Sequence, residues 1–369
     1  SMFRVIGKLS SPKCLKKLPS FDNPVDLANN FDSFFEDNIK KLYGRFDNNH
    51  PSPISVDIHD HCTSSFATFR VVTSDEVMKM IKSCSITSCK LDPLPLSVFK
   101  ECYSELLPVF TEIINRSLSF GHFPDHLKEA CILPLLKKQH LDPECLSNYR
   151  PISNLRFISK LIERAVVSQL HDYLHENNLH AKMQSAYRPF HSTETALVRV
   201  QDEILRALDN HKEAILVLLD FSAAFDTINH EHLIQRLSSL YGITGTALNW
   251  FSSYLNNRTQ HVLINNFKSD RHHLWCGVPQ GFVAGPLEFI LCSAPLQDLI
   301  AAHGISSVAY ADDTQLYITF DPADRASAIA KVEVCIQDVK SWALSNKLAL
   351  NDSKTEILFL RSRFAKRIS

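Results

Sequence analysis

The amino-acid sequence predicts an α+β fold in which a sheet is flanked by helices. Stretches with apolar residues at helical spacing alternate with short apolar runs that are typical of strands. Acidic residues stand at two of these runs, at Asp220 and at Asp312-Asp313. The 369 residues exceed what one compact core usually needs, so two or three subdomains are expected.

The overall charge of the chain gives no information about its partners. Thirty-nine Lys and Arg residues balance 40 Asp and Glu residues, which leaves a formal net charge of −1. A nucleic-acid partner therefore has to be argued from local clusters. One basic cluster lies at residues 361–367, where a solvated chain end and a phosphate contact are both open alternatives.

The cysteines and the apolar runs favour an intracellular protein. The ten cysteines are scattered without a C-x-x-C pair, so reduced thiols are expected rather than disulfides or a zinc site. No apolar run approaches the roughly 20 residues that span a membrane, and no secretory signal is expected.

The first half of the chain is predicted to be mostly helical. Residues 1–72 are expected to form an N-terminal extension and linker, with an amphipathic helix over 25–42 and the linker at 48–53. Ser74-Asp75-Glu76 opens the next helix. The other predicted elements are a turn at 91–95, helices over 96–118, 156–174 and 192–210, and a strand over 130–136.

The second half contains the strands that carry acids. The apolar run 213–219 ends in Asp220, which is typical of a buried central strand that delivers a carboxylate at its end. Residues 307–320 are predicted to be a hairpin with Asp312-Asp313 at its turn. The other predicted elements are helices over 229–241 and 245–255, a hairpin of 259–265 with 268–275, a helix from about 285, a helix over 323–345 and a strand over 355–360.

Three carboxylates converge if Asp220 and Asp312-Asp313 belong to one sheet. Unpaired like charges a few ångströms apart repel one another, and a divalent cation relieves this repulsion. Mg²⁺ favours carboxylate oxygens and keeps positions for water and phosphate. Two such ions about 3.5–4 Å apart can activate a 3′-hydroxyl and stabilise leaving pyrophosphate. An isolated Asp-Asp pair is more often a solvated turn, and the second strand-end acid favours the catalytic hypothesis.

Six motifs resemble those of reverse transcriptases, in the same order along the chain. The resemblance runs from about residue 91 to residue 360, and it is to non-LTR (LINE-type) retrotransposons of the jockey-like branch. The motifs are Tyr310-Ala311-Asp312-Asp313 (Y-x-D-D), 219–226 (with D-x-x-x-A-F-D), 277–281 (G-V-P-Q-G), the finger motifs at 148–153 and 188–193, and the motif of Trp342, Leu350-Asn351 and Lys354-Thr355.

The resemblance implies a fold and an activity. The fold is the fingers and palm of a right-hand polymerase, with an antiparallel palm sheet flanked by helices and with the thumb absent. The implied division is an extension at 1–72, fingers at 73–210 and a palm at 211–369. The implied activity is RNA-directed DNA polymerase, which adds deoxynucleoside triphosphates to a DNA primer on an RNA template. The duplex is then gripped through its backbone rather than read by sequence.

The resemblance also implies the catalytic residues. Asp220, Asp312 and Asp313 are the expected catalytic acids. Two Mg²⁺ ions, for which Mn²⁺ can substitute, are the expected cofactors. The implied metal ligands are these three carboxylates and the backbone carbonyl of Phe221.

The expected substrate-binding residues surround the incoming nucleotide. Phe225 matches the position of a steric gate that excludes the 2′-hydroxyl, with core packing as the alternative. Gln280 is expected to contact the nucleotide and the template base. Arg150 and Arg188 are expected to hold the triphosphate, since guanidinium groups match phosphate geometry. Lys354 is the expected cation or proton donor on the phosphate side.

The sequence departs from the family pattern after residue 281. Phe282 stands where a small residue is usual and is expected to crowd the nucleotide pocket or the template base, and Ala284 replaces a larger aliphatic residue. Glu288 stands at a usually apolar place, where an unpaired acid costs roughly a few kcal/mol. These departures and the missing thumb keep open the alternative of a catalytically silent remnant that binds nucleic acid or a protein.

Two further expectations follow from the resemblance. An RNA-dependent RNA polymerase is disfavoured by Phe225, since such an enzyme must admit the 2′-hydroxyl. The expected location is the nucleus and cytoplasm, in a retroelement ribonucleoprotein without membrane contact. The oligomeric state is left open by the sequence.

Overall fold

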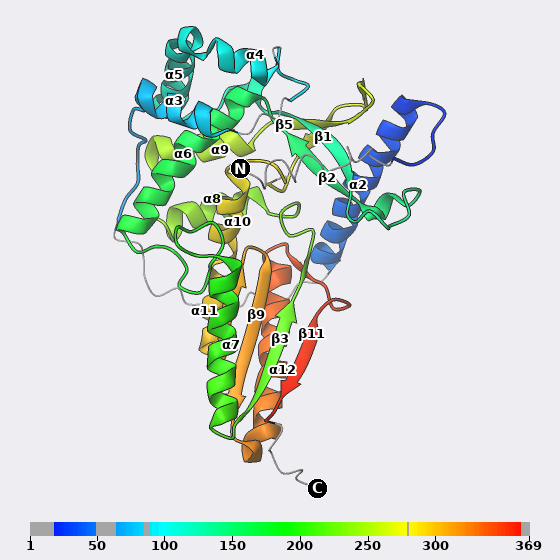
Figure 1. The fold of residues 1–369 in the computed structure, drawn as a ribbon, viewed down its shortest axis with the longest axis vertical. Coiled ribbons are helices and arrows are strands. Elements are labelled where there is room, and N and C mark those ends of the chain that lie inside the picture. The colour runs from blue at the N-terminus through cyan, green and yellow to red at the C-terminus, as the bar shows by residue number, and fades with distance from the viewer. Residues whose placement is uncertain (1–17, 49–63, 85–88, 94, 279, 363–369) are drawn as a thin grey trace, which may run out of the picture.

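The molecule contains two main sheets with helices around them (Figure 1). The computed structural model describes residues 18–48, 64–84, 89–93, 95–278 and 280–362. One sheet, which we call the lower sheet, occupies the lower half of Figure 1, and the other, the upper sheet, lies beside a group of helices in the upper half. The predicted α+β class is confirmed.

The lower sheet is antiparallel and has the strand order β11-β3-β9-β8. On the inner strand β3, Ala214 packs against helix α7, whereas Ile215 and Val217 join the main core, which includes residues of helix α12. Because β3 is covered on both faces, its sequence is almost continuously apolar. The elements are β3 (Glu213–Leu219), β8 (Ser306–Tyr310), β9 (Asp313–Phe320), β11 (Glu356–Leu360), α7 (Thr193–Asp209) and α12 (Arg325–Ser345).

The upper sheet is mixed and has the order β2-β1-β5-β6, with β7 also paired to β5. Its strands β1 and β5 are parallel, with Cys131 opposite His261, and they come from opposite sides of residue 210. The division at 210 that the family resemblance implied therefore does not separate the two sheets. The strands are β1 (Glu129–Leu136), β2 (Tyr149–Asn154), β5 (Arg258–Ile264), β6 (Phe267–Lys268) and β7 (His272–Leu274).

Helix α2 (Pro24–Asn48) lies across the upper sheet and reaches toward the lower part of the molecule (Figure 1). The ring of Phe31 packs edge-on against Tyr149 of β2, with ring centroids 4.9 Å apart. Near the other end of the helix, the Tyr43 hydroxyl donates to the carbonyl of Thr227 at 3.0 Å. The predicted amphipathic helix is confirmed, and it connects two parts of the fold.

The predicted helix over 96–118 is wrong in one respect, because it is divided at Cys102. That residue adopts φ −109° and ψ 17° and separates α4 from α5. Phe99 of α4 contacts the rings of Phe110 and Phe157, with centroids 4.9 and 4.8 Å away, so tertiary packing overrides the local periodicity.

The other predicted helices and hairpins are found within a few residues of their expected bounds, whereas α11, the 3₁₀ turns and the short strands β4 and β10 were not predicted. The elements not yet given are α3 (Ser74–Ser83), α4 (Leu96–Glu101), α5 (Tyr103–Phe120), α6 (Phe157–Glu176), α8 (His230–Ser239), α9 (Gly245–Leu255), α10 (Gly285–Ser293), α11 (Pro295–Ala302), the 3₁₀ turns Asp125–Leu127, Leu146–Asn148 and Pro322–Asp324, and the short strands β4 (Phe221–Ser222) and β10 (Ala349–Leu350).

Some predicted features lie outside the described residues. They include most of the linker at 48–53, Pro279 of the 277–281 motif, and the basic residues from 363 onward. Among the helices that are described, none combines the length and the apolar character needed to cross a membrane.

Candidate active site

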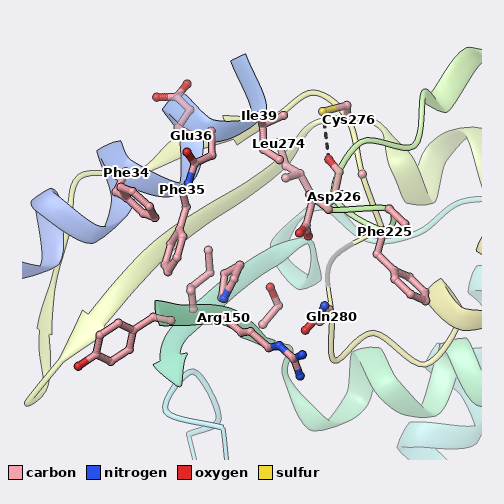
Figure 2. A pocket seen from close by; sticks show the side chains of 18 of the residues that line it. Phe34, Phe35, Glu36, Ile39, Arg150, Phe225, Asp226, Leu274, Cys276 and Gln280 are labelled. Carbon is pink, nitrogen blue, oxygen red and sulfur yellow. Dashed lines mark hydrogen bonds between the residues drawn. The ribbon is translucent and has the colours of Figure 1, made fainter. Parts of the chain in front are cut away.

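A cavity of about 730 Å³ is lined by residues of both sheets (Figure 2). Its wall contains every predicted site residue except Arg188. Helix α2 adds Phe34, Glu36 and Ile39, which the sequence did not indicate as site residues. The predicted residues on the wall are Arg150, Asp220, Phe221, Phe225, Gln280, Asp312, Asp313 and Lys354.

The acids meet where strand β3 ends beside the β8–β9 hairpin. Tyr310 pairs with Asp313, so Ala311 and Asp312 form the two-residue turn. Ala311 adopts φ +58°, a left-handed conformation that favours glycine and is costly for other residues. Leu219 pairs with Thr314, which places the following residue, Asp220, beside the start of β9.

The electrostatics of the turn show that the acids act on one another. Burial raises the pKa of Asp312, and the charges of Asp313 and Asp220 raise it further. The charge of Arg150 and a backbone hydrogen bond oppose this rise. The site therefore concentrates negative charge that a cation would relieve.

Asp220 is held by the segment that precedes β11. The Lys354 ammonium lies 3.1 Å from a carboxylate oxygen of Asp220. The Asn351 amide donates to the Asp220 carbonyl at 2.8 Å, and β10 pairs with β4 beside it. These contacts place a cation next to the predicted catalytic acid.

Two more basic groups face the acids from the upper sheet and the loop after it. Arg150 of β2 is exposed and acts electrostatically on Asp312. Lys137 also lines the cavity, and its pKa is lowered by partial burial and by the charges of Arg150 and Lys354. The sequence did not single out Lys137, although it follows the β1 run directly.

Gln280 is fixed by contact with strand β2. The Ser153 amide donates to the Gln280 carbonyl at 2.8 Å. The next residue, Gly281, adopts φ +112°, and an added Cβ would lie 2.1 Å from the Ser153 carbonyl oxygen. Only glycine fits there, so the close approach of the two backbones holds Gln280 on the cavity wall.

The chain matches the family model described as reverse transcriptase (RNA-dependent DNA polymerase) over residues 135–365. The chain belongs to the reverse transcriptase family. The matched region includes all residues of the cavity wall apart from those of helix α2 and Ile132. The predicted resemblance is therefore confirmed at the level of the family.

Relatives of this reverse transcriptase come from non-LTR retrotransposons. It is 29% identical over 287 residues to the probable RNA-directed DNA polymerase from transposon BS of Drosophila melanogaster, covering 76% of this chain and 31% of the relative. It is 24% identical over 330 residues to the RNA-directed DNA polymerase from mobile element jockey of the same species, covering 87% of this chain and 35% of the relative. The chain thus spans about a third of the length of the curated relatives it matches.

Phe225 lies between the cavity and the core, so its position agrees with either of the two alternatives that the sequence left open. The side chain is half-buried and lines the cavity. Its ring also stacks on Phe289 of α10, with centroids 4.7 Å apart and an interplanar angle of 30°. This support from the core fixes the ring in the cavity wall of the reverse transcriptase.

Arg188 is not brought to the cavity wall by this structure. Its guanidinium donates to the carbonyls of Ala181 and Gln184 at 3.1 and 3.0 Å. The side chain therefore holds its own loop together, and the predicted triphosphate contact is not prepared by this geometry.

Asp226 is a second acid that the sequence did not assign to the site. It lines the cavity, and burial raises its pKa to about 7 (Figure 2). The Cys276 thiol donates to the backbone carbonyl of Asp226 at 3.4 Å. This carboxyl therefore holds its proton more tightly than an exposed aspartate does.

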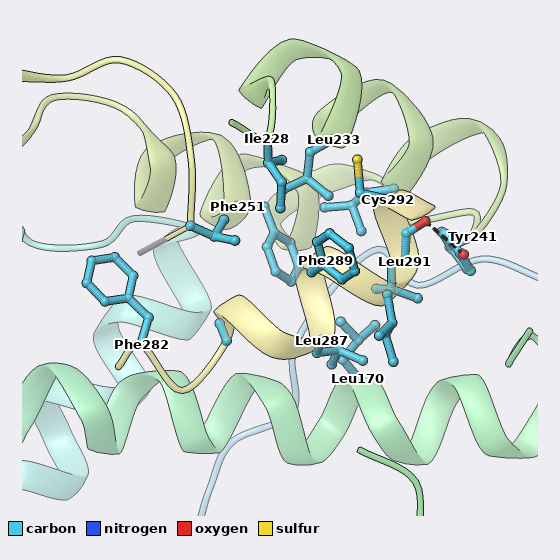
Figure 3. Packing of buried hydrophobic residues seen from close by; sticks show 14 of the residues in the cluster. Leu170, Ile228, Leu233, Tyr241, Phe251, Phe282, Leu287, Phe289, Leu291 and Cys292 are labelled. Atoms are coloured by element: carbon cyan, nitrogen blue, oxygen red, sulfur yellow. Dashed lines mark hydrogen bonds between the residues drawn. The ribbon is translucent and has the colours of Figure 1, made fainter. Parts of the chain in front are cut away.

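Phe282 lies behind the cavity rather than in it, so the prediction that it crowds the nucleotide pocket is wrong. Its ring is 4% exposed and belongs to the main hydrophobic core (Figure 3). The Arg258 guanidinium lies 4.4 Å from the centroid of this ring and 4.5 Å from that of Tyr254. We call Glu163, Tyr254, Arg258, Phe282 and Glu288 the buried cluster.

The two acids of the buried cluster have different partners. A carboxylate oxygen of Glu163 accepts the amides of Val283 and Ala284, at the start of α10. Both oxygens of Glu288 lack a hydrogen-bond partner among the described residues. Burial and the neighbouring Glu163 raise the pKa of Glu288 to about 8. Glu288 is therefore mainly protonated at pH 7, which reduces the cost predicted for an unpaired charge.

The cavity acids suit hard divalent cations, which reverse transcriptases generally use. Mg²⁺ is usually held by one or two carboxylates together with substrate phosphates, rather than by a cage of side chains. In the described parts of the chain, no three or more His, Cys, Asp and Glu side chains form a group able to hold a metal by themselves. Asp220 and Asp312 on one wall, with mutual repulsion, fit such a shared site.

Proposed function

We propose that this chain is the polymerase core of a non-LTR retrotransposon reverse transcriptase, which extends a primer on an RNA template with deoxynucleotides. The observation that carries the proposal is one cavity whose wall contains Asp220, Asp312 and Asp313 together with Arg150 and Lys137. Acids that can bind metal ions, together with cations that can neutralise phosphate oxygens, are what phosphoryl transfer from a triphosphate requires.

Asp220 and Asp312 are the proposed ligands of Mg²⁺, with the Phe221 carbonyl and Asp313 in support. Two bound ions would supply activation of the primer 3′-hydroxyl and stabilisation of the leaving pyrophosphate. The carboxylates are oriented beforehand by the two-residue turn and by the end of β3. Lys354 neutralises Asp220 and is well placed to move to a phosphate oxygen when nucleotide enters.

The other cavity residues select and hold the nucleotide in this proposal. Arg150 and Lys137 neutralise the triphosphate. The Phe225 ring, supported by Phe289, blocks the space of a 2′-hydroxyl. Gln280, fixed through Ser153, faces the base of the nucleotide or of the template. We extend the proposal to a nuclear and cytoplasmic ribonucleoprotein of the retroelement.

Primer extension on an RNA template with Mg²⁺ and deoxynucleotides tests the proposal, with Asp312→Asn beside the wild type. We expect products from the wild type and a rate at least about 10³-fold lower from the variant. Extension that is unchanged in Asp312→Asn contradicts the assigned site. Tight binding of template and primer without synthesis by the wild type supports the silent remnant instead.

A further inference from the structure

The catalytic turn is attached to a loop from a distant part of the sequence. Gln184 forms an isolated parallel bridge with Ala309 of strand β8. The Ser185 amide donates to the Ala309 carbonyl, and the Ala309 amide donates to the Met183 carbonyl, each at 2.9 Å. These bonds bring the Gln184 side chain to the β8–β9 turn.

The side-chain amide of Gln184 grips both backbone groups of one residue in that turn. The Ala311 amide donates to Oε1 at 3.0 Å, and Nε2 donates to the Ala311 carbonyl at 3.2 Å. Gln184 is only 3% exposed, so water competes little for these bonds. Ala311 is the residue at φ +58°, whose conformation needs support from its surroundings.

The loop that carries Gln184 is itself braced. Oε1 of Gln184 also accepts the Ala186 amide at 2.9 Å. The Arg188 guanidinium donates to the Gln184 and Ala181 carbonyls. The side chain therefore has little freedom, and it holds the peptide that immediately precedes Asp312.

We propose that Gln184 is a positioning residue, which fixes the left-handed Ala311 turn and thereby the direction in which Asp312 presents its carboxylate to the metal. The inference rests on the proposed function, because that function assigns the metal to Asp312. The contacts of Gln184 with Ala311 do not depend on it. A primary amide carries an acceptor and a donor side by side, which is what the Ala311 peptide groups require. Replacement by an apolar or a charged side chain breaks this match.

Gln169 provides a matched control elsewhere in the fold. Its side-chain amide, on α6, accepts the Arg70 amide at 2.8 Å and donates to the Arg70 carbonyl at 3.1 Å. It is 5% exposed. Gln169→Ala removes the same kind of paired contact as Gln184→Ala, and Gln169 is not part of the cavity wall.

The first test measures binding of Mn²⁺ alone by electron paramagnetic resonance, with Asp312→Asn as the baseline. We expect Gln184→Ala to weaken Mn²⁺ binding by about 10-fold or more, since groups that orient metal ligands usually have effects of this size. Hydrogen exchange at the Ala311 amide should become faster in the same variant. Gln169→Ala should change neither quantity, although it lowers the free energy of unfolding.

The second test uses Gln184→Glu and the pH. Its ionised carboxylate can accept the Ala311 and Ala186 amides but repels the Ala311 carbonyl, whereas the protonated acid regains a donor. We therefore expect the Mn²⁺ affinity of this variant, as a ratio to that of the wild type at each pH, to rise as the pH falls.

Three results would contradict the inference. Equal weakening by Gln169→Ala and Gln184→Ala would show a general loss of stability, and unchanged Mn²⁺ binding in Gln184→Ala would show that the turn holds itself. Mn²⁺ binding no stronger in the wild type than in Asp312→Asn would also overturn it. A wild type that binds Mn²⁺ yet fails to extend primers contradicts the proposed function alone.

Discussion

The cavity and the buried cluster treat acidic side chains in opposite ways. In the cavity, Asp220 and Asp312 stay near basic groups at a surface that water and substrate can reach. In the buried cluster, Glu288 is 1% exposed and is kept neutral by a pKa of about 8. Carboxyl groups in the cavity are therefore available to bind a cation, whereas the carboxyl group of Glu288 is neutral and is packed within the core.

This difference teaches where a substitution should act. The cavity acids repel one another, and this arrangement is useful because it favours binding of a divalent cation, which in turn can bind a triphosphate. The carboxylate of Glu163, in contrast, accepts hydrogen bonds from the amides of Val283 and Ala284, at the start of helix α10. Changes in the cavity should alter rates, and changes in the buried cluster should alter stability.

The largest expected effect is that of Asp312→Asn, which should lower the rate of primer extension without lowering stability. Loss of the carboxylate should abolish extension as described above, yet leave the protein at least as stable. The pKa of Asp312 is raised by burial and by like charges. The ionised side chain therefore lowers the free energy of unfolding when the pH is above the ordinary pKa of an aspartate. Urea unfolding of both proteins at pH 7 measures their stability. A clear loss of stability in Asp312→Asn would contradict the view that cavity residues affect rates rather than stability.

Phe282→Ser should have the next largest effect, on stability. Removing the buried ring leaves a cavity and takes away the aromatic face beside Arg258, at a cost of about 3 kcal/mol. Because the ring lies outside the cavity wall, the extension rate per folded molecule should not rise. A faster variant would restore the hypothesis that Phe282 crowds the nucleotide.

Phe225→Val should change selectivity more than stability. The smaller side chain opens space on the cavity wall, so the preference for deoxynucleotides over ribonucleotides should fall by about 10–100-fold. The ratio of kcat/KM for the two nucleotides measures the effect. Leu287→Val, in the main core and outside the cavity wall, is the control that should leave this ratio unchanged.

The smallest expected effect concerns Glu288 and the pH. Its folded-state pKa of about 8 lies above its ordinary value of 4.5, so the folded state binds the proton more tightly. Stability should be full below pH 4.5 and decrease as the pH rises through 8. Glu288→Gln should flatten this slope and stabilise the protein at pH 8 by about 1–2 kcal/mol. An unchanged slope would mean that Glu288 is not the titrating group.

The sequence revealed the parts of the site that local patterns determine. The apolar run before Asp220 and the hairpin around Asp312-Asp313 were recognisable because alternation and chain reversal are encoded in neighbouring residues. Glycine at 281 was likewise visible within its motif, although its reason, the Ser153 carbonyl, was not.

The parts that the sequence did not reveal depend on contacts between distant segments. The parallel pairing of β1 with β5 joins residues more than a hundred positions apart, and no local period indicates it. Arg188 finds carbonyls of its own loop, and the Phe282 ring finds Arg258, only once the chain has folded. A motif identifies a residue, whereas its partners decide what the side chain does.

The wall of the cavity has a consequence for any attempt to shorten this protein. Its members extend along the chain from Phe34 on helix α2 to Lys354 before strand β11. A fragment that begins after α2 loses one side of the chamber, and one that stops before residue 349 loses both the ion pair of Asp220 and the strand beside β4. The smallest unit that retains a complete chamber is therefore nearly the entire described chain, so fragments for crystallisation or screening have little to spare at either end.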